Sequence, residues 1–86
     1  MSKREETVAA LRGFVLENYL FSDDQSLLKN EDSFLASKIM DSMGVLELVS
    51  FLEEEFGVET EDQEMIPNNL DSIDKLVVFV ESKSAD

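Results

Sequence analysis

The segment from Asp41 to Gly57 reads DSMGVLELVSFLEEEFG and is the clearest helical pattern in the sequence. Its apolar residues recur three and four positions apart, which is the spacing of one face of an α-helix. Asp41 and Ser42 are both residue types that cap helix N-termini, and Gly57 is the type that most often follows a helix C-terminus. The segment therefore predicts a helix that begins at Asp41 or Ser42 and ends near Phe56.

The same helical spacing appears on either side of this segment. It predicts a first helix over residues 3–20 and a last helix that begins near Asp71, with Asp74 in its first turn. We expect residues 3–81 to be ordered and residues 82–86 to form a frayed tail.

Two connections join these helices. The first, residues 21–41, is long and polar, and we expect Phe34 and Leu35 to hold it against the core. The second contains a predicted short helix over residues 61–66, stopped by Pro67. The expected fold class is all-α: a small bundle of three main helices and one short helix.

Length and charge limit the possible functions. Eighty-six residues make one domain, 1–86, and 20 acidic against 7 basic residues give a formal net charge of -13. Such a charge repels nucleic acid and anionic membranes and attracts partners with basic surfaces. The sequence contains neither a run long enough for a membrane span nor a signal-type apolar stretch. We therefore expect a cytoplasmic monomer that inserts into no membrane.

Cysteine and histidine are absent, so the chain lacks a cysteine nucleophile, a thiolate metal site, the commonest general base and the commonest metal ligand. A calcium loop of the EF-hand type is also excluded, because the window 23–34 has Leu28 and Phe34 where glycine and glutamate are required. We expect no metal site and no catalytic residues, and hence a protein that is not an enzyme.

Ser42 is the residue with the clearest chemical potential. The N–H groups in the first turn of a helix lack internal acceptors, and the helix dipole favours negative charge there. A phosphate attached to the Ser42 hydroxyl would therefore be stabilised, and a modifying enzyme could reach it.

Asp41-Ser42-Met43, placed between Phe34-Leu35 and Glu47-Leu48, resembles the phosphopantetheine attachment motif of acyl carrier proteins. The similarity extends over nearly the whole chain. It includes the segments 52–57 and 70–73 as well as the helical pattern. The resemblance implies that a phosphopantetheinyl transferase moves 4'-phosphopantetheine from coenzyme A onto Ser42, with Asp41 helping to position the transferase's metal ion. The thiol of that arm would carry an acyl or aminoacyl group as a thioester.

The resemblance also implies a docking surface on the helix that follows the serine. Its members would be Met43, Leu46, Glu47, Glu53 and Glu54, facing a basic surface on an activating ligase, synthase or transferase. Gly44 differs from the acid that fatty acid carriers usually have two residues after the serine.

Gly44 and the segment 67–73 look more like specialised carriers than the housekeeping fatty acid carrier. Such carriers include D-alanyl carriers and free-standing carriers of polyketide or nonribosomal peptide pathways. The alternative function is that of an acidic helical adaptor with no covalent group.

Overall fold

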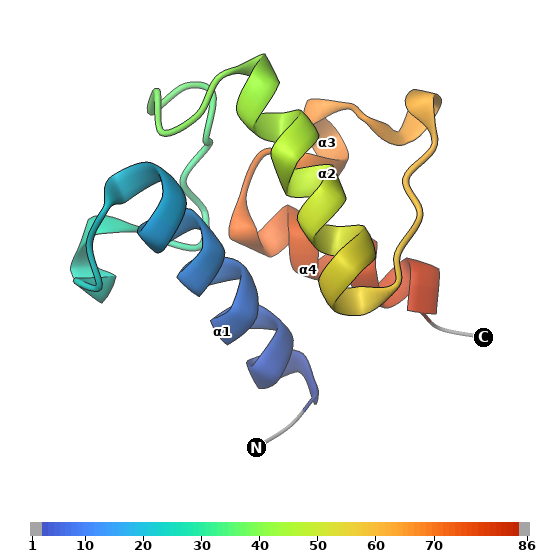
Figure 1. Cartoon of the computed structure of the whole chain (residues 1–86), viewed down its shortest axis with the longest axis horizontal. Coiled ribbons are helices and arrows are strands. Elements are labelled where there is room, and N and C mark those ends of the chain that lie inside the picture. Colours follow the sequence, from blue (N-terminus) through green and yellow to red (C-terminus); the bar gives the residue numbers. More distant parts are fainter. Residues whose placement is uncertain (1–2, 85–86) are drawn as a thin grey trace.

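The computed structural model describes residues 3–84, and all regular structure in this part of the chain is helical (Figure 1). The three main helices are α1 (Lys3–Val15), α2 (Ser42–Phe56) and α4 (Ile73–Ser84), and the short fourth is α3 (Pro67–Leu70). A π-helical turn, Leu16–Leu20, continues α1, and single 3₁₀ turns lie at Gln25–Leu27 and Asp62–Glu64. The predicted all-α bundle is confirmed. None of the helices within 3–84 is long and apolar enough to cross a membrane.

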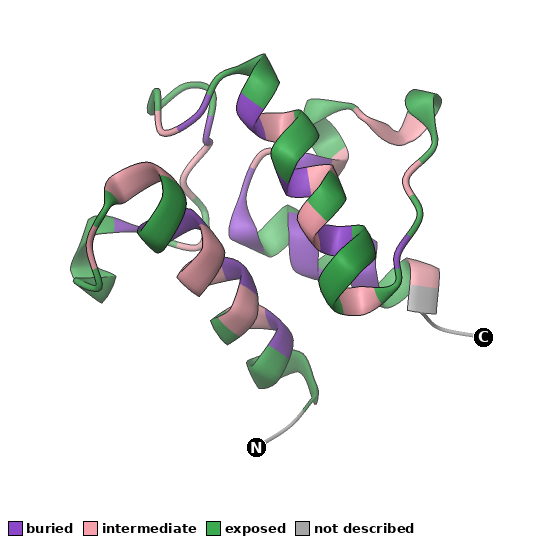
Figure 2. Cartoon of the chain, in the orientation of Figure 1, coloured by how far each residue is buried: buried purple, intermediate pink, exposed green. Residues whose placement is uncertain are grey.

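The buried apolar residues of these elements form one core. Figure 2 shows that the buried positions lie mainly where the helices face one another. Helix α4 packs against both α1 and α3, so the last helix lies at the centre of the arrangement. The fully buried side chains with the largest volumes are Leu11, Val15, Leu16, Phe34, Leu48, Leu52, Ile73, Leu76 and Val77. They come from each main helix and from the first connection. The apolar residues that recur at helical spacing in the sequence therefore form the core.

Both ends of α2 are capped by the residues that the sequence predicts. The Asp41 carboxylate is the N-cap and accepts the Gly44 N–H at 3.0 Å, which leaves Ser42 as the first helical residue. At the other end Gly57 adopts φ = 67°, a left-handed conformation that side chains disfavour, and its N–H donates to the Glu53 carbonyl at 3.0 Å.

Of the two residues expected to hold the first connection against the core, Phe34 and Leu35, only Phe34 does so. Phe34 is fully buried, which confirms that prediction, but the prediction for Leu35 is wrong because its side chain is 41% exposed. The backbone of Leu35 is bound at the surface, because its N–H donates to a carboxylate oxygen of Asp71 at 3.0 Å. That bond holds Leu35 at the surface, beside the junction between α3 and α4.

The short helix lies later in the chain than predicted. Pro67 begins α3 instead of ending a helix over 61–66. Proline is favourable in the first turn of a helix, because its fixed φ suits a helix and an N–H at that position would have no helical acceptor. The acidic segment before it forms only the 3₁₀ turn Asp62–Glu64. That turn is closed by a reciprocal capping box between Glu61 and Glu64.

The last helix also differs from its predicted limits. It begins at Ile73, and the Ser72 hydroxyl accepts the Lys75 N–H at 3.1 Å as a cap would. The predicted frayed tail is wrong for residues 82–84, which are helical; the Lys83 ammonium binds the Glu64 carboxylate at 2.7 and 2.9 Å and ties this turn down. Residues 85–86 of that tail lie outside the described residues.

Candidate functional site

Ser42 is exposed at the start of α2, as the sequence predicts. Within residues 3–84 no hydrogen bond engages its hydroxyl, so the oxygen is available for reaction. Asp41 is also exposed, although one of its carboxylate oxygens caps the helix. The two residues of the predicted attachment motif are therefore adjacent, accessible and fixed by the helix that they begin.

Ser42 lies at the edge of an apolar groove of about 370 Å³. One wall is α2, and the other is the segment from Met65 to Asp71 that contains α3. The apolar lining residues are Leu35, Met43, Val45, Leu46, Met65, Ile66, Pro67 and Leu70. The only polar residues in the lining are Ser42 and Asp71, so the groove is suited to an apolar ligand.

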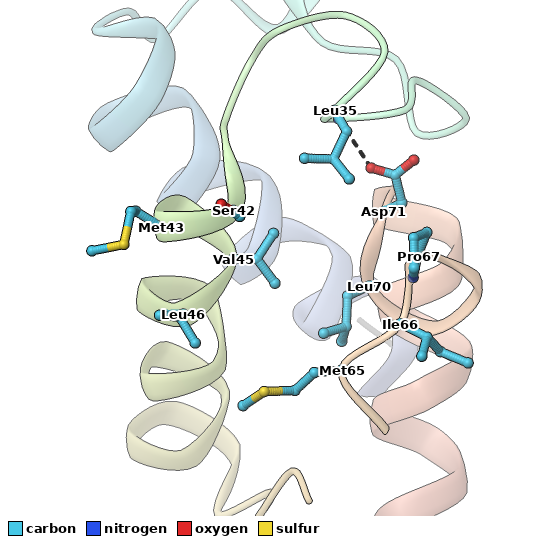
Figure 3. A pocket seen from close by; sticks show the side chains of 10 residues that line it. All are labelled: Leu35, Ser42, Met43, Val45, Leu46, Met65, Ile66, Pro67, Leu70 and Asp71. Atoms are coloured by element: carbon cyan, nitrogen blue, oxygen red, sulfur yellow. Dashed lines mark hydrogen bonds between the residues drawn. The ribbon is translucent and has the colours of Figure 1, made fainter. Parts of the chain in front are cut away.

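The close-up in Figure 3 shows how the walls face one another. Val45 projects from α2 toward Leu70, and Met65 extends from the opposite wall toward α2. Methionine is flexible and adapts its shape to what it contacts, so Met65 can adjust the width of the groove. Ser42 lies at one end of the groove, the end at which Leu35 also lies.

At that end of the groove Asp71 contacts Ser33 and Leu35, and we call these contacts the latch. The Ser33 hydroxyl donates to one carboxylate oxygen of Asp71, and the Leu35 N–H donates to the other at 3.0 Å. The Phe34 N–H also donates to the Asp71 carbonyl at 2.9 Å. The latch joins the first connection to the junction of α3 and α4, and it places Leu35 over the groove.

A second contact supports the helix start from the side of α1. The Tyr19 hydroxyl donates to the Gly44 carbonyl at 3.2 Å, two residues beyond Ser42. Burial raises the pKa of Tyr19, and the negative charges of Glu47 and Asp41 raise it further. The phenol therefore stays protonated and remains a donor at neutral pH.

The five predicted docking residues, Met43, Leu46, Glu47, Glu53 and Glu54, are all exposed on α2. Because an α-helix turns about 100° per residue, their positions fall within about one third of its circumference. Met43 is 66% exposed and Leu46 is 50% exposed, so two apolar side chains stand among the acids. The structure thus brings all five together on one face, beside Ser42.

Two residues that line the groove, Leu70 and Asp71, were missed from the sequence, where they looked only like the start of the last helix. For Met65 the sequence left two interpretations open, a shallow cleft and ordinary packing, and the structure places it in the wall of the groove. No local signal could have found the groove, because its walls are separated by about a full helix and a loop. The pairing of Tyr19 with Gly44 was equally hidden, although a glycine in the first turn of a strong helix was an indication of close packing.

No protein-family model matches this chain. The geometry of the helix start can be compared with what a phosphopantetheine attached to Ser42 would require. The N–H groups of Gly44 and Val45 already donate to Asp41, whereas those of Ser42 and Met43 lie in the first turn, where helical acceptors are lacking. A free hydroxyl, an anion-favouring helix start and an adjacent apolar groove fit that group.

Proposed function

We propose that this chain is an acyl carrier protein that bears 4'-phosphopantetheine on Ser42. The observation that carries the proposal is the exposed Ser42 hydroxyl at the first position of α2, opening onto an apolar groove. A hydroxyl placed only as a helix cap would point back to the N–H groups of its own helix, and here Asp41 performs that function instead. Ser42 is thereby free for modification.

The modification is a transfer between two oxygens. The Ser42 oxygen attacks the pantetheine-bearing phosphorus of coenzyme A, and the bond from that phosphorus to the nucleotide breaks. Adenosine 3',5'-bisphosphate leaves, and the hydroxyl proton passes to a base on the transferase. Asp41 places a negative charge next to the incoming phosphate, so the reaction calls for a cation, which the transferase's metal ion would supply.

Once attached, the arm supplies a thiol, which the cysteine-free chain lacks, and this thiol holds cargo as a thioester. The chain's own contribution is to fix the attachment point and to offer the groove. The first-turn N–H groups of Ser42 and Met43, which lack helical acceptors, could donate to the phosphate. The groove residues Val45, Met65 and Leu70 would shield an apolar chain from water.

Between the acyl and aminoacyl alternatives, the groove favours the acyl cargo. An ammonium group entering it would meet one acid, Asp71, whose two oxygens already accept from Ser33 and Leu35. Each buried methylene of an acyl chain would instead contribute about 0.8 kcal/mol. If so, the melting temperature of loaded chains should rise with acyl length, which differential scanning calorimetry measures. A melting temperature independent of length would leave the cargo outside the groove.

The acidic face of α2 would serve partner enzymes. Glu47, Glu53 and Glu54 can pair with basic residues, while Met43 and Leu46 can enter an apolar socket. The partners proposed are a phosphopantetheinyl transferase and an activating ligase, synthase or acyltransferase with a basic surface. The protein would act as their carrier and not as an enzyme.

The proposal is tested by incubating the purified chain with a broad-specificity phosphopantetheinyl transferase and fluorescently labelled coenzyme A. We expect labelling of the unsubstituted chain and of Ser50→Ala, which removes an exposed serine from the same helix. Ser42→Ala should not be labelled. Absence of label from every form would refute the carrier function and favour the acidic adaptor.

A further inference from the structure

The N–H and the carbonyl of Gly44 both form hydrogen bonds with side chains that lie outside α2. Its N–H donates to the Asp41 carboxylate at 3.0 Å, and its carbonyl accepts the Tyr19 hydroxyl at 3.2 Å. Gly44 lies in the same helical turn as Ser42, two residues away. The turn that carries the reactive hydroxyl is thus held by two side chains, one of which comes from a distant part of the sequence.

Tyr19 reaches this position from the π-helical turn Leu16–Leu20. A π-helical turn is rare and occurs frequently at functional sites. The side chain of Tyr19 is half-buried and its ring packs edge-on against Phe14, with centroids 5.9 Å apart. The ring is therefore supported from behind, and its hydroxyl is directed at α2.

The close approach of Met40 and of the Tyr19 ring leaves no room for a side chain at residue 44. A Cβ atom at this position would lie 2.8 Å from Met40 Cβ and 3.1 Å from Tyr19 Cε1, and both distances are shorter than ordinary contacts. The acid that fatty acid carriers have here would displace Tyr19 or Met40. A glycine weakens a helix by about 1 kcal/mol relative to alanine, so the contact is retained against a cost.

We propose that Tyr19 is a positioning residue for the modification of Ser42, acting through the Gly44 carbonyl. This inference rests on the proposed carrier function. The first turn of a helix frays readily, and phosphoryl transfer requires the attacking oxygen to be in line with the phosphorus. By holding Gly44, Tyr19 narrows the range of positions that the Ser42 oxygen visits, and this increases the rate of the chemical step without changing docking.

The first test compares Tyr19→Phe with Thr7→Val in a steady-state transferase assay with coenzyme A. Thr7 is the matched control, because its buried hydroxyl also donates to a helix carbonyl, that of Lys3 at 3.0 Å, but at the far end of α1. Loss of one hydrogen bond should lower kcat by about three- to tenfold for Tyr19→Phe and leave KM unchanged. Thr7→Val should be loaded like the unsubstituted chain.

A second variant separates positioning from helix stability. Gly44→Ala improves the helix propensity of the first turn but pushes the Tyr19 ring and Met40 away. If loading depended only on a stable helix, Gly44→Ala would be loaded faster. Because the Tyr19 contact is what matters in this proposal, kcat should fall, and combining Gly44→Ala with Tyr19→Phe should lower it little further. This variant retains Tyr19, so it tests the proposal even if Tyr19→Phe does not fold.

The outcomes distinguish the two proposals. An unsubstituted chain that accepts no phosphopantetheine overturns the carrier function and the positioning role with it. A chain that is loaded normally, with the same kcat for Tyr19→Phe and a higher kcat for Gly44→Ala, overturns the positioning role alone. Equal losses in Tyr19→Phe and Thr7→Val would likewise overturn it, since they would show a general loss of stability.

Discussion

Asp71 offers a quantitative test of how the latch holds the first connection. Its carboxylate accepts one hydrogen bond from the Ser33 hydroxyl and one from the Leu35 N–H, and both bonds are lost in Asp71→Ala. Hydrogen bonds to a charged group contribute about 1.5–3 kcal/mol each when buried, and these are only partly so. We therefore expect a loss of about 2 kcal/mol in the free energy of unfolding, or about 8–16 °C in melting temperature for a domain of this size.

The matched control for this prediction is Asp74→Ala. Asp74 lies in the first turn of α4, and within residues 3–84 its carboxylate accepts no hydrogen bond. Both variants remove one negative charge from a chain of formal net charge -13, so relief of charge repulsion cancels in the comparison. The control should lose only about 0.5 kcal/mol through the helix dipole.

The assay is urea denaturation followed by far-ultraviolet circular dichroism. Asp71→Asn, which keeps one oxygen acceptor, should fall between the two alanine variants. If Asp71→Ala is as stable as Asp74→Ala, the latch does not hold the first connection to the rest of the fold.

Three further predictions concern the helix start, acid stability and docking. Asp41→Ala should lose about 1 kcal/mol through its cap, whereas Ser42→Ala should leave thermal denaturation unchanged; equal losses would contradict the assignment of Asp41 as the cap. The pKa of Glu64 is lowered by the Glu61 N–H and by Lys83, so Glu64 contributes stability above its unfolded-state pKa of about 4.3 and loses it as the pH falls through the lower folded value. Glu64→Gln should therefore flatten the acid side of a melting-temperature profile, and an unchanged slope would count against this. Glu47→Lys should raise the transferase KM more at low than at high ionic strength, and a salt-independent change would argue against electrostatic docking.

The parts of the fold that depend on local pattern were predictable. The apolar spacing of α2, the acid before it and Gly57 after it are all contained in one segment, and they located Ser42 at the helix start. The buried position of Phe34 followed in the same way, because a large aromatic residue in a long polar loop has few other places to go.

The parts that depend on contacts between distant segments were not predictable. Leucine is usually buried, yet Leu35 is held at the surface because its N–H donates to Asp71, 36 positions later. Pro67 can end one helix or begin the next, and the 3₁₀ turn that precedes it decided between them. The groove joins two walls that no single window of sequence contains, and the Tyr19 contact depends on a π-helical turn that has no simple sequence signature.

The mass of the chain after co-expression with a phosphopantetheinyl transferase tests the carrier function. We expect an increase equal to one phosphopantetheinyl group, and peptide mapping should place it on Ser42. An unchanged mass, or a group attached to any other serine, would contradict the proposal that Ser42 is the attachment site.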